Sequence, residues 1–213
     1  MKKIRNKKRR YLRSRITQRL IVDTAEQVFL EKGYNKTTIT EISKQAGVGY
    51  GTVYSHFQGK DDLLTKVIDR AMEDFMNILN DPQSIETIND LQKVFEQRIY
   101  ATLQIAVEQR EIFKVFQKAL GQSDLVFDHW NEILNQFITR VENDLYRSRE
   151  KNIVTSNIDL YFSTKALILT LESFLWEIVH EKESDLDILT LTLTNLFIQG
   201  LCSSESLSSL TPK

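Results

Sequence analysis

A run of hydrogen-bonding side chains between residues 50 and 56 has the most readily interpreted chemistry in the chain. Such side chains carry little net charge but donate and accept hydrogen bonds, which suits the base edges and phosphate oxygens of DNA. Val53 and Phe57 are four residues apart, so they share the inward face of a short helix. The more exposed faces of that helix then carry Tyr50, Thr52, Tyr54, Ser55 and His56.

A preceding amphipathic helix and a tight turn must position this short helix. Ile39 and Ala46 lie on one face of the first helix, and Gly47 supplies the backbone freedom that the turn needs. This pattern is typical of a helix-turn-helix, whose second helix lies in the DNA major groove. The alternative is a helical hairpin of the core whose polar residues are merely solvated. Further candidates for DNA contact around the motif are Thr38, Thr40, Gly49 and Lys60.

The order of short motifs along this region resembles a known family. A helix from Ile16 to Lys32 comes first, and the motifs that follow it are Gly33-Tyr34, Thr37-Thr38-Ile39, Gly47-Val48, Gly51-Thr52-Val53-Tyr54, His56-Phe57 and Lys60. This combination, from about Ile16 to Leu64, resembles the N-terminal domain of TetR-family transcriptional regulators. The resemblance implies an N-terminal domain that binds operator DNA. It also implies a variable helical C-terminal domain that dimerises and binds an inducer.

Charge is divided unevenly along the 213 residues, although the net charge is only -1. Residues 1–60 hold 14 Lys and Arg against 4 Asp and Glu, a net charge of +10, whereas residues 61–213 hold 14 against 25, a net charge of -11. A basic end joined to an acidic body indicates a polyanionic partner at one end only. We therefore expect double-stranded DNA to contact the N-terminal part.

Residues 1–14 form a polybasic arm that we expect to be flexible when free. Its predicted role is to follow phosphates or to enter a minor groove beside the operator. A solubility tail and a membrane-surface patch are the alternatives. The first helix is predicted from Ser14 or Arg15 to Lys32, and Arg15 and Thr17 near its start are candidates for contact with the DNA backbone. Its predicted inward residues are Ile16, Leu20, Ile21, Ala25, Val28 and Phe29.

The chain is predicted to be all-α, because it has only 7 Gly and 2 Pro and repeats apolar residues at helical spacing. About nine helices are expected. Those after the DNA-binding motif are predicted at 60–80, 85–109, 111–120, 124–149, 157–182 and 185–201. Residues 188–194 alternate like a strand, but no partner strand is evident, so a helix is favoured. The predicted domains are the arm 1–14, a DNA-binding domain 15–62, a regulatory and dimerisation domain 63–202, and a flexible tail 203–213.

The helix predicted at 157–182 is apolar nearly all round, and we expect one chain of this size to cover only part of its surface. Together with the last helix it predicts a four-helix homodimer interface, with Phe174, Leu175 and Leu193 as interface residues. Core packing inside a monomer is the alternative. Because the apolar residues of the helix at 60–80 cover more than one face, this helix is expected to link the DNA-binding and regulatory parts.

Aromatic residues recur through the middle helices, where the family resemblance implies a pocket for a small-molecule inducer. An apolar or aromatic inducer is expected, with a few polar groups to orient it. Glu172 and Glu177 are candidates for that polar role, although such residues are more often exposed. The predicted ligand-binding residues are Phe95, Phe113, Phe116, Trp130, Phe137, Phe162, Glu172 and Trp176.

Catalysis, metal binding and a bound cofactor find little support in the sequence. The three histidines are far apart and show no ligand spacing, and Cys202 has no basic or histidine neighbour to activate it. No apolar run is long enough to span a membrane, so a cytoplasmic location is expected. The sequence therefore predicts a ligand-responsive transcriptional regulator that acts as a homodimer on palindromic operators. A repressor is favoured over an activator. The alternatives are a ligand-independent DNA-organising protein and a membrane-surface protein that uses the basic arm.

Overall fold

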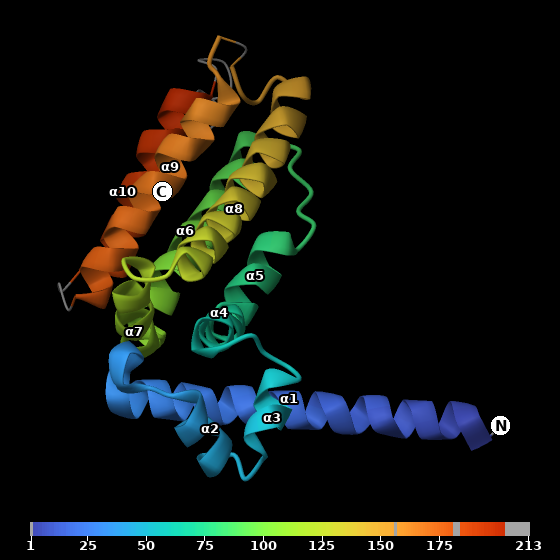
Figure 1. The fold of residues 1–213 in the computed structure, drawn as a ribbon. Coiled ribbons are helices and arrows are strands. Elements are labelled where there is room, and N and C mark those ends of the chain that lie inside the picture. The colour runs from blue at the N-terminus through green and yellow to red at the C-terminus, as the bar shows by residue number, and fades with distance from the viewer. Residues whose placement is uncertain (1, 156, 181–183, 203–213) are drawn as a thin grey trace. The chain divides into compact units, whose positions relative to one another are not determined.

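The computed structural model describes residues 2–155, 157–180 and 184–202, and within these ranges its regular elements are all helices (Figure 1). This confirms the predicted all-α fold, and the segment 188–194 is helical. The described ranges hold ten helices: α1 (Lys2–Lys36), α2 (Ile39–Gln45), α3 (Tyr50–Tyr54), α4 (Lys60–Ala71), α5 (Glu73–Asn80), α6 (Ile88–Glu108), α7 (Arg110–Leu120), α8 (Asp124–Glu150), α9 (Leu160–Val179) and α10 (Leu186–Leu201). The predicted tail 203–213 lies outside the described residues.

The chain divides into two units, the first of residues 1–71 with 111–129 and the second of residues 72–110 with 130–213. The first unit therefore contains most of α7 and the start of α8 in addition to α1–α4. The chain therefore passes between the two units at three places, after residues 71, 110 and 129. The sequence predicted one such passage, after residue 62, and those domain bounds stay a prediction. Sequence position alone does not reveal such a discontinuous unit, because its parts are brought together only by folding.

Helix α1 begins at Lys2, well before the predicted start at Ser14 or Arg15. The side chains of residues 1–10 lie outside the described ones, so the flexibility of the arm stays a prediction. Two residues of the predicted inward stripe point outward instead, since Ile16 is 60% and Leu20 44% exposed. The first unit offers these two positions no covering surface. The other four predicted residues, Ile21, Ala25, Val28 and Phe29, are fully buried.

The predicted helix-turn-helix is present in α2 and α3. Thr38 caps α2 by accepting a hydrogen bond from the backbone N–H of Glu41 at 3.3 Å. Gly47 ends the helix with φ of 64°, a conformation that is costly for residues with a Cβ. Val53 and Phe57 are buried as predicted, and they anchor α3 to the rest of the unit.

The helix predicted over residues 60–80 is interrupted, which is the main correction to the predicted elements. Helix α4 ends at Ala71, Met72 has non-helical angles (φ -96°, ψ 2°), and α5 starts at Glu73. The division between the two units falls at the same point. The interruption also accounts for finding ten helices in the described ranges where nine were expected.

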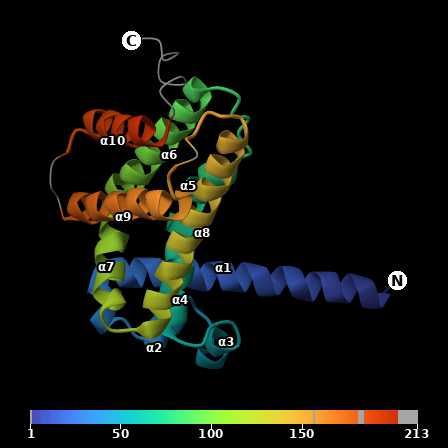
Figure 2. The ribbon, with the colours of Figure 1, turned by 90° about the horizontal axis from the view of Figure 1, so that it is seen from above.

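Helix α6 is central to the second unit, where it contacts α5, α9 and α10 (Figure 2). Its start is fixed by a capping box, in which Thr87 accepts from the backbone of Asp90 and the Asp90 carboxylate accepts from the backbone of Thr87. Arg98 and Asp144 form a buried ion pair between α6 and α8, with Nη1 and Oδ2 2.7 Å apart. The helices of this unit are thus held by an apolar core with an ion pair inside it.

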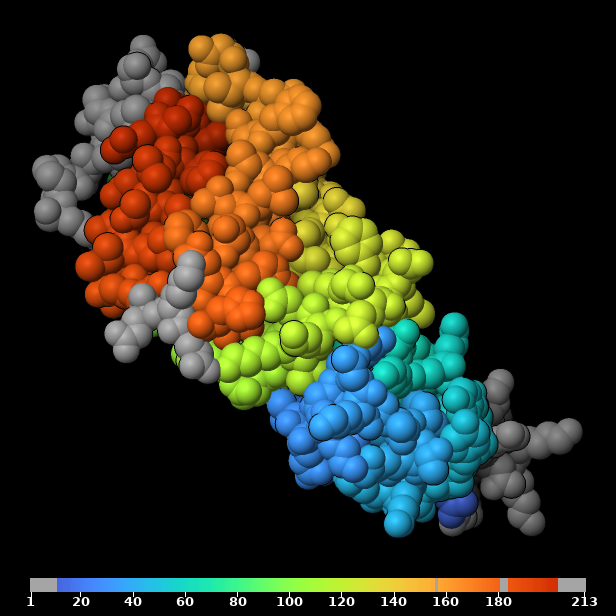
Figure 3. All heavy atoms as spheres, turned by 60° about the vertical axis from the view of Figure 1, so that its left-hand side comes forward, coloured from blue at the N-terminus to red at the C-terminus, as the bar shows by residue number. Residues whose placement is uncertain are grey.

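One face of the second unit is formed by α9 and α10, which lie side by side there (Figure 3). Large apolar side chains remain exposed on these helices: Phe162, Leu169, Ile188, Leu191 and Leu196. Two residues predicted for the dimer interface, Leu175 and Leu193, are instead buried within the protomer. The apolar surface of α9 is therefore shared between the protomer's own core and an uncovered stripe.

Candidate DNA interface and ligand pocket

Two tyrosines dominate the exposed surface of the short helix α3. Tyr50 is 52% and Tyr54 46% exposed, and their ring centroids are 4.9 Å apart. The Tyr50 and Tyr54 hydroxyls share a hydrogen bond at 3.3 Å, and this bond raises the pKa of Tyr54. Because Val53 fixes the opposite face of the helix, the two phenol groups form one hydrogen-bonding edge.

The other predicted DNA contacts of the motif have varied exposure. Thr38, Thr40, Gly49 and Ser55 are exposed, whereas Thr52 and His56 are half-buried. The Ser55 hydroxyl donates to the backbone carbonyl of Thr52 at 2.7 Å. On α1, Arg15 is exposed and Thr17 is half-buried. All of these residues belong to the first unit.

Lys60 has a structural role that sequence reasoning missed. Its Nζ donates to the backbone carbonyl oxygen of Tyr34 at 3.0 Å and lies 4.2 Å from the centroid of the Tyr34 ring. These contacts hold the start of α4 against the end of α1. The ammonium group of Lys60 thus already has partners within the protein. A contact between Lys60 and phosphate stays a prediction.

The carboxylate of Asp61 is a second missed element of the first unit. Tyr34 donates to its Oδ1 at 2.8 Å, and Ser123, just before α8, donates to its Oδ2 at 2.9 Å. Burial and the hydrogen bond to Asp61 raise the pKa of Tyr34 to about 12. Further along α4, Arg70 pairs with Asp23 and Glu26 of α1. In the sequence, Asp61 in the first turn of α4 is explained by its favourable interaction with the helix dipole. The sequence therefore did not indicate that its carboxylate also binds tertiary partners.

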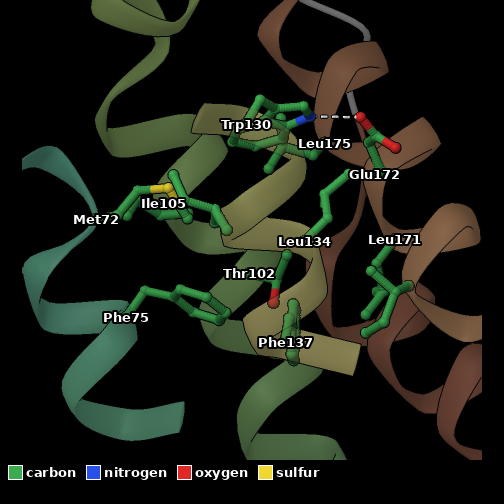
Figure 4. A pocket seen from close by; sticks show the side chains of 12 residues that line it. Met72, Phe75, Thr102, Ile105, Trp130, Leu134, Phe137, Leu171, Glu172 and Leu175 are labelled. Carbon is green, nitrogen blue, oxygen red and sulfur yellow. Dashed lines mark hydrogen bonds between the residues drawn. The ribbon is translucent and has the colours of Figure 1, made fainter. Parts of the chain in front are cut away.

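A small apolar pocket lies within the second unit (Figure 4). It is lined by side chains from α5, α6, α8 and α9, together with Met72 at the interruption between α4 and α5. Its volume is about 20 Å³, which is room for about one water molecule. The lining residues are Met72, Phe75, Thr102, Ile105, Trp130, Ile133, Leu134, Phe137, Ile168, Leu171, Glu172 and Leu175.

Glu172 is the charged member of this lining, and two indoles hold its carboxylate. Trp130 Nε1 donates to Oε1 at 2.6 Å, as Figure 4 shows, and Trp176 Nε1 donates to the same oxygen at 3.4 Å. The two indole rings have centroids 5.4 Å apart. The carboxylate and the two tryptophans therefore form one connected group at the edge of the pocket.

The structure brings together some of the predicted ligand-binding residues and separates others. Trp130, Phe137 and Glu172 line the pocket, and Trp176 contacts it through Glu172. Phe95 is buried outside the lining, and Phe162 is 68% exposed on α9. Phe113 and Phe116 are fully buried in the first unit. Glu177 does not line the pocket, whereas Met72, Phe75 and Leu134 do and were missed.

Neither metal ligands nor membrane spans are found in the described ranges. Within residues 2–155, 157–180 and 184–202, no three His, Cys, Asp or Glu side chains are grouped as a metal site would need. In the same part of the chain, the helices are too short or too polar to cross a membrane. Cys202 is buried, and this burial raises the pKa of its thiol to about 11.

Comparison with known proteins decides the family. The family model described as "Bacterial regulatory proteins, tetR family" matches residues 21–67, which include α2 and α3. The transcriptional repressor BepR of Brucella suis is 30% identical over 192 residues, which cover 87% of this chain and 91% of BepR. The chain belongs to the TetR family. It is a DNA-binding transcriptional regulator, as the motifs of its N-terminal part predicted.

Solved structures share the fold of this TetR-family regulator over most of its length. A complex of SmeT with triclosan has a TM-score of 0.71 at 21% identity, covering 93% of this chain and all of that one. SmeT is described as the repressor of a multidrug efflux pump of Stenotrophomonas maltophilia. FadR of Bacillus subtilis, in complex with stearoyl-CoA, has a TM-score of 0.68 at 23% identity, covering 85% of this chain and 97% of FadR.

Proposed function

We propose that this TetR-family regulator is a cytoplasmic repressor, which binds a palindromic operator as a homodimer and leaves it when a small, largely apolar molecule binds. The exposed Tyr50–Tyr54 pair carries the proposal, because it presents two hydroxyl groups from a helix fixed on its other side. Such groups suit hydrogen bonds to phosphate oxygens and base edges. BepR, which is similar over most of both chains, is also named a repressor.

In this proposal, DNA meets one surface of the first unit. The tyrosine pair of α3 enters the major groove, where His56 and Thr52 make further contacts with the DNA. Thr38 and Thr40 at the start of α2, and Arg15 on α1, contact the phosphate backbone. Phosphate contacts fix the register of the helix on the duplex, whereas base contacts select the sequence.

Dimerisation would use the uncovered stripe of α9 and α10. Phe162 and Leu169 on α9, with Leu191 and Leu196 on α10, are large apolar side chains exposed on one protomer. Their burial against a second copy would remove this apolar area from water, which is the main driving force for association. A two-fold dimer places two recognition helices about 34–36 Å apart, the spacing of successive major grooves.

The ligand part of the proposal depends on the pocket of the second unit. Its volume of about 20 Å³ is too small for an aromatic or acyl compound, so such a ligand must displace the walls. It would therefore stabilise a conformation with a larger pocket. SmeT has been solved with triclosan, and FadR with stearoyl-CoA, in which a long apolar acyl chain is attached to a polar coenzyme A group.

Met72 supplies the route by which an enlarged pocket could affect DNA binding. It lines the pocket and is also the residue at which α4 ends before α5 begins. A ligand that displaces Met72 and Phe75 would change the backbone at this interruption, which continues directly into α4. Even a 100-fold loss of operator affinity needs only about 2.7 kcal/mol of coupling.

The test begins by mapping where the protein binds on its own genome, to obtain the operator. Apolar compounds are then screened by quenching of Trp130 and Trp176 fluorescence, and hits are titrated with and without operator. By reciprocity, the operator must weaken ligand binding by the same factor by which ligand weakens operator binding. Equal ligand affinity in both titrations would refute the coupling. Indiscriminate binding to unrelated sequences without any ligand response would favour a DNA-organising protein.

A further inference from the structure

The pocket has a negatively charged side chain, Glu172, at its edge, and an apolar or aromatic ligand would make no use of this charge. We infer that it prefers ligands in which a cationic group, such as a substituted ammonium, is attached to an aromatic body, with Glu172 as the counter-charge. This inference rests on one part of the proposed function, namely that the inducer binds in this pocket. It adds the charge of the ligand, which the proposed function leaves open.

The lining lacks a cationic side chain that could neutralise Glu172. Ten of its twelve members are aliphatic, aromatic or methionine side chains, and the remaining two are Thr102 and Glu172. The Thr102 hydroxyl donates to the backbone carbonyl of Arg98 at 2.8 Å, so its proton is already engaged. Among the described residues, no ion pair of Glu172 with Lys, Arg or His is found. Its charge is therefore oriented but not balanced.

The two indoles orient the carboxylate without using its full capacity. Both Nε1 groups donate to the same oxygen, Oε1, at 2.6 Å from Trp130 and 3.4 Å from Trp176. An ionised carboxylate has about four acceptor positions, so its second oxygen can still accept from a ligand. Neutral N–H donors hold the side chain in place but leave its charge of -1 on the pocket.

The tryptophan rings add a second attraction for positive charge. Trp130 and Trp176 are tilted by 52° with centroids 5.4 Å apart, and Trp130 lines the pocket. Indole is the aromatic side chain that attracts cations most strongly through its electron-rich face. A cation beside Glu172 would therefore meet a carboxylate and an indole at once. A ligand carboxylate at the same position would face a like charge in a weakly screened environment.

Three probes of nearly the same shape but different charge test this inference. They are the (biphenyl-4-yl)trimethylammonium cation, neutral 4-tert-butylbiphenyl and the biphenyl-4-carboxylate anion. Each is titrated into the full-length protein while tryptophan fluorescence is recorded. We expect the cation to bind at least about tenfold more tightly than the neutral compound, and the anion to bind most weakly.

Two substitutions on α9 separate the pocket carboxylate from general surface charge. Glu172→Gln keeps an oxygen that can accept from the indoles but removes the charge, so cation affinity should fall to that of the neutral compound. Glu177→Gln removes the same charge from the same helix outside the pocket lining, and the preference for the cation should persist. Unchanged helix content by circular dichroism verifies that both variants are folded.

Three results would overturn the inference: equal binding of cation and neutral probe, a preference that survives in Glu172→Gln, or no binding of any probe. Operator binding in the absence of probes is measured separately on the same preparations. If the operator is bound while the charge preference is absent, only this inference fails. If no operator is bound, the proposed repressor fails whatever the probes do.

Discussion

The phenolic oxygen of Tyr34, near the end of α1, lies 2.8 Å from Oδ1 of Asp61 in the first turn of α4. The second oxygen of this carboxylate accepts from Ser123, which precedes α8. One side chain thus joins three segments that are far apart in the sequence, all within the unit that carries the helix-turn-helix. The contact therefore stabilises the packing of α1, α4 and α8 in this unit. It does not itself belong to the proposed DNA-binding surface.

Tyr34→Phe should lower the free energy of unfolding by about 1 kcal/mol at neutral pH, the usual contribution of one hydrogen bond. The pKa of Tyr34 is raised from 10.0 to about 12 in the folded protein. Its stabilisation is therefore complete below the unfolded pKa and is lost as the pH rises through about 12. The difference in urea stability between the two proteins should shrink over this range. Tyr100→Phe is the control, and a pH-independent difference would contradict the assignment.

Tyr54→Ala should weaken operator binding by about 1–3 kcal/mol, because it removes a hydroxyl and a ring from the exposed face of α3. Dimerisation and helix content should not change, since this side chain contributes little to the core. Operator affinity is measured by fluorescence anisotropy at one salt concentration. Tyr146→Ala removes a comparably exposed tyrosine from α8 and should bind as the parent protein does. Equal affinity of both variants would exclude α3 as the recognition helix.

Deletion of residues 2–10 should reduce the salt dependence of DNA binding. The segment contains Lys2, Lys3, Arg5, Lys7, Lys8, Arg9 and Arg10. For every phosphate that the shortened protein no longer neutralises, the slope of log affinity against log salt concentration should fall by about 0.9. The slopes are compared on operator and on unrelated DNA, and both should fall, because phosphate contacts carry no sequence information. An unchanged slope would show that the arm does not contact the DNA.

Leu169→Glu and Leu196→Glu should each convert the dimer into a monomer, because either places a carboxylate inside the proposed interface. An unpaired charge buried there costs several kcal/mol unless the interface opens. Sedimentation velocity at micromolar concentration measures the change. Leu30→Glu alters a comparably exposed leucine on α1 and should leave the dimer intact. A parent protein that sediments as a monomer would end the proposal of a homodimer.

Asp144→Ala should destabilise the protein by about 3–5 kcal/mol, since it leaves the buried guanidinium of Arg98 without its counter-charge. Burial already lowers the pKa of Arg98, and Asp144 opposes this effect. Replacing both partners by Met and Leu should cost less than removing Asp144 alone, because no unpaired charge remains. Glu150→Ala, at an exposed position of α8, is the control. A double variant as unstable as Asp144→Ala would show that the ion pair is not the cause.

The helix-turn-helix was predictable because local spacing decides it. Val53 in α3 and Phe57, just after its end, are four residues apart and are buried together, and Gly47 marks the turn that precedes the helix. The interruption at Met72 was not predictable in the same way. The apolar residues from Leu63 to Leu79 keep helical spacing across it, and this stretch contains no Pro or Gly to indicate the break.

Which aromatic residues line the pocket depends on tertiary packing more than on local pattern. Phe113 and Trp130 both belong to amphipathic helices, but they fall in different units, and only Trp130 of the two reaches the cavity. Periodicity indicates which face of a helix is inward but not what that face meets. For the same reason Ile16 and Leu20 were expected to be buried, although the first unit has nothing to cover them.

The small size of the pocket has a consequence for the speed of any response. A cavity with room for about one water admits a biphenyl-sized molecule only after its walls have moved. If the walls move first, the observed on-rate levels off at high ligand concentration, at the rate of spontaneous opening. The measured affinity is then reduced by the small fraction of molecules that are open at any moment. Side chains such as Met72 and Leu134, which lie outside the unit that carries the helix-turn-helix, would in this way set the threshold concentration at which the regulator responds.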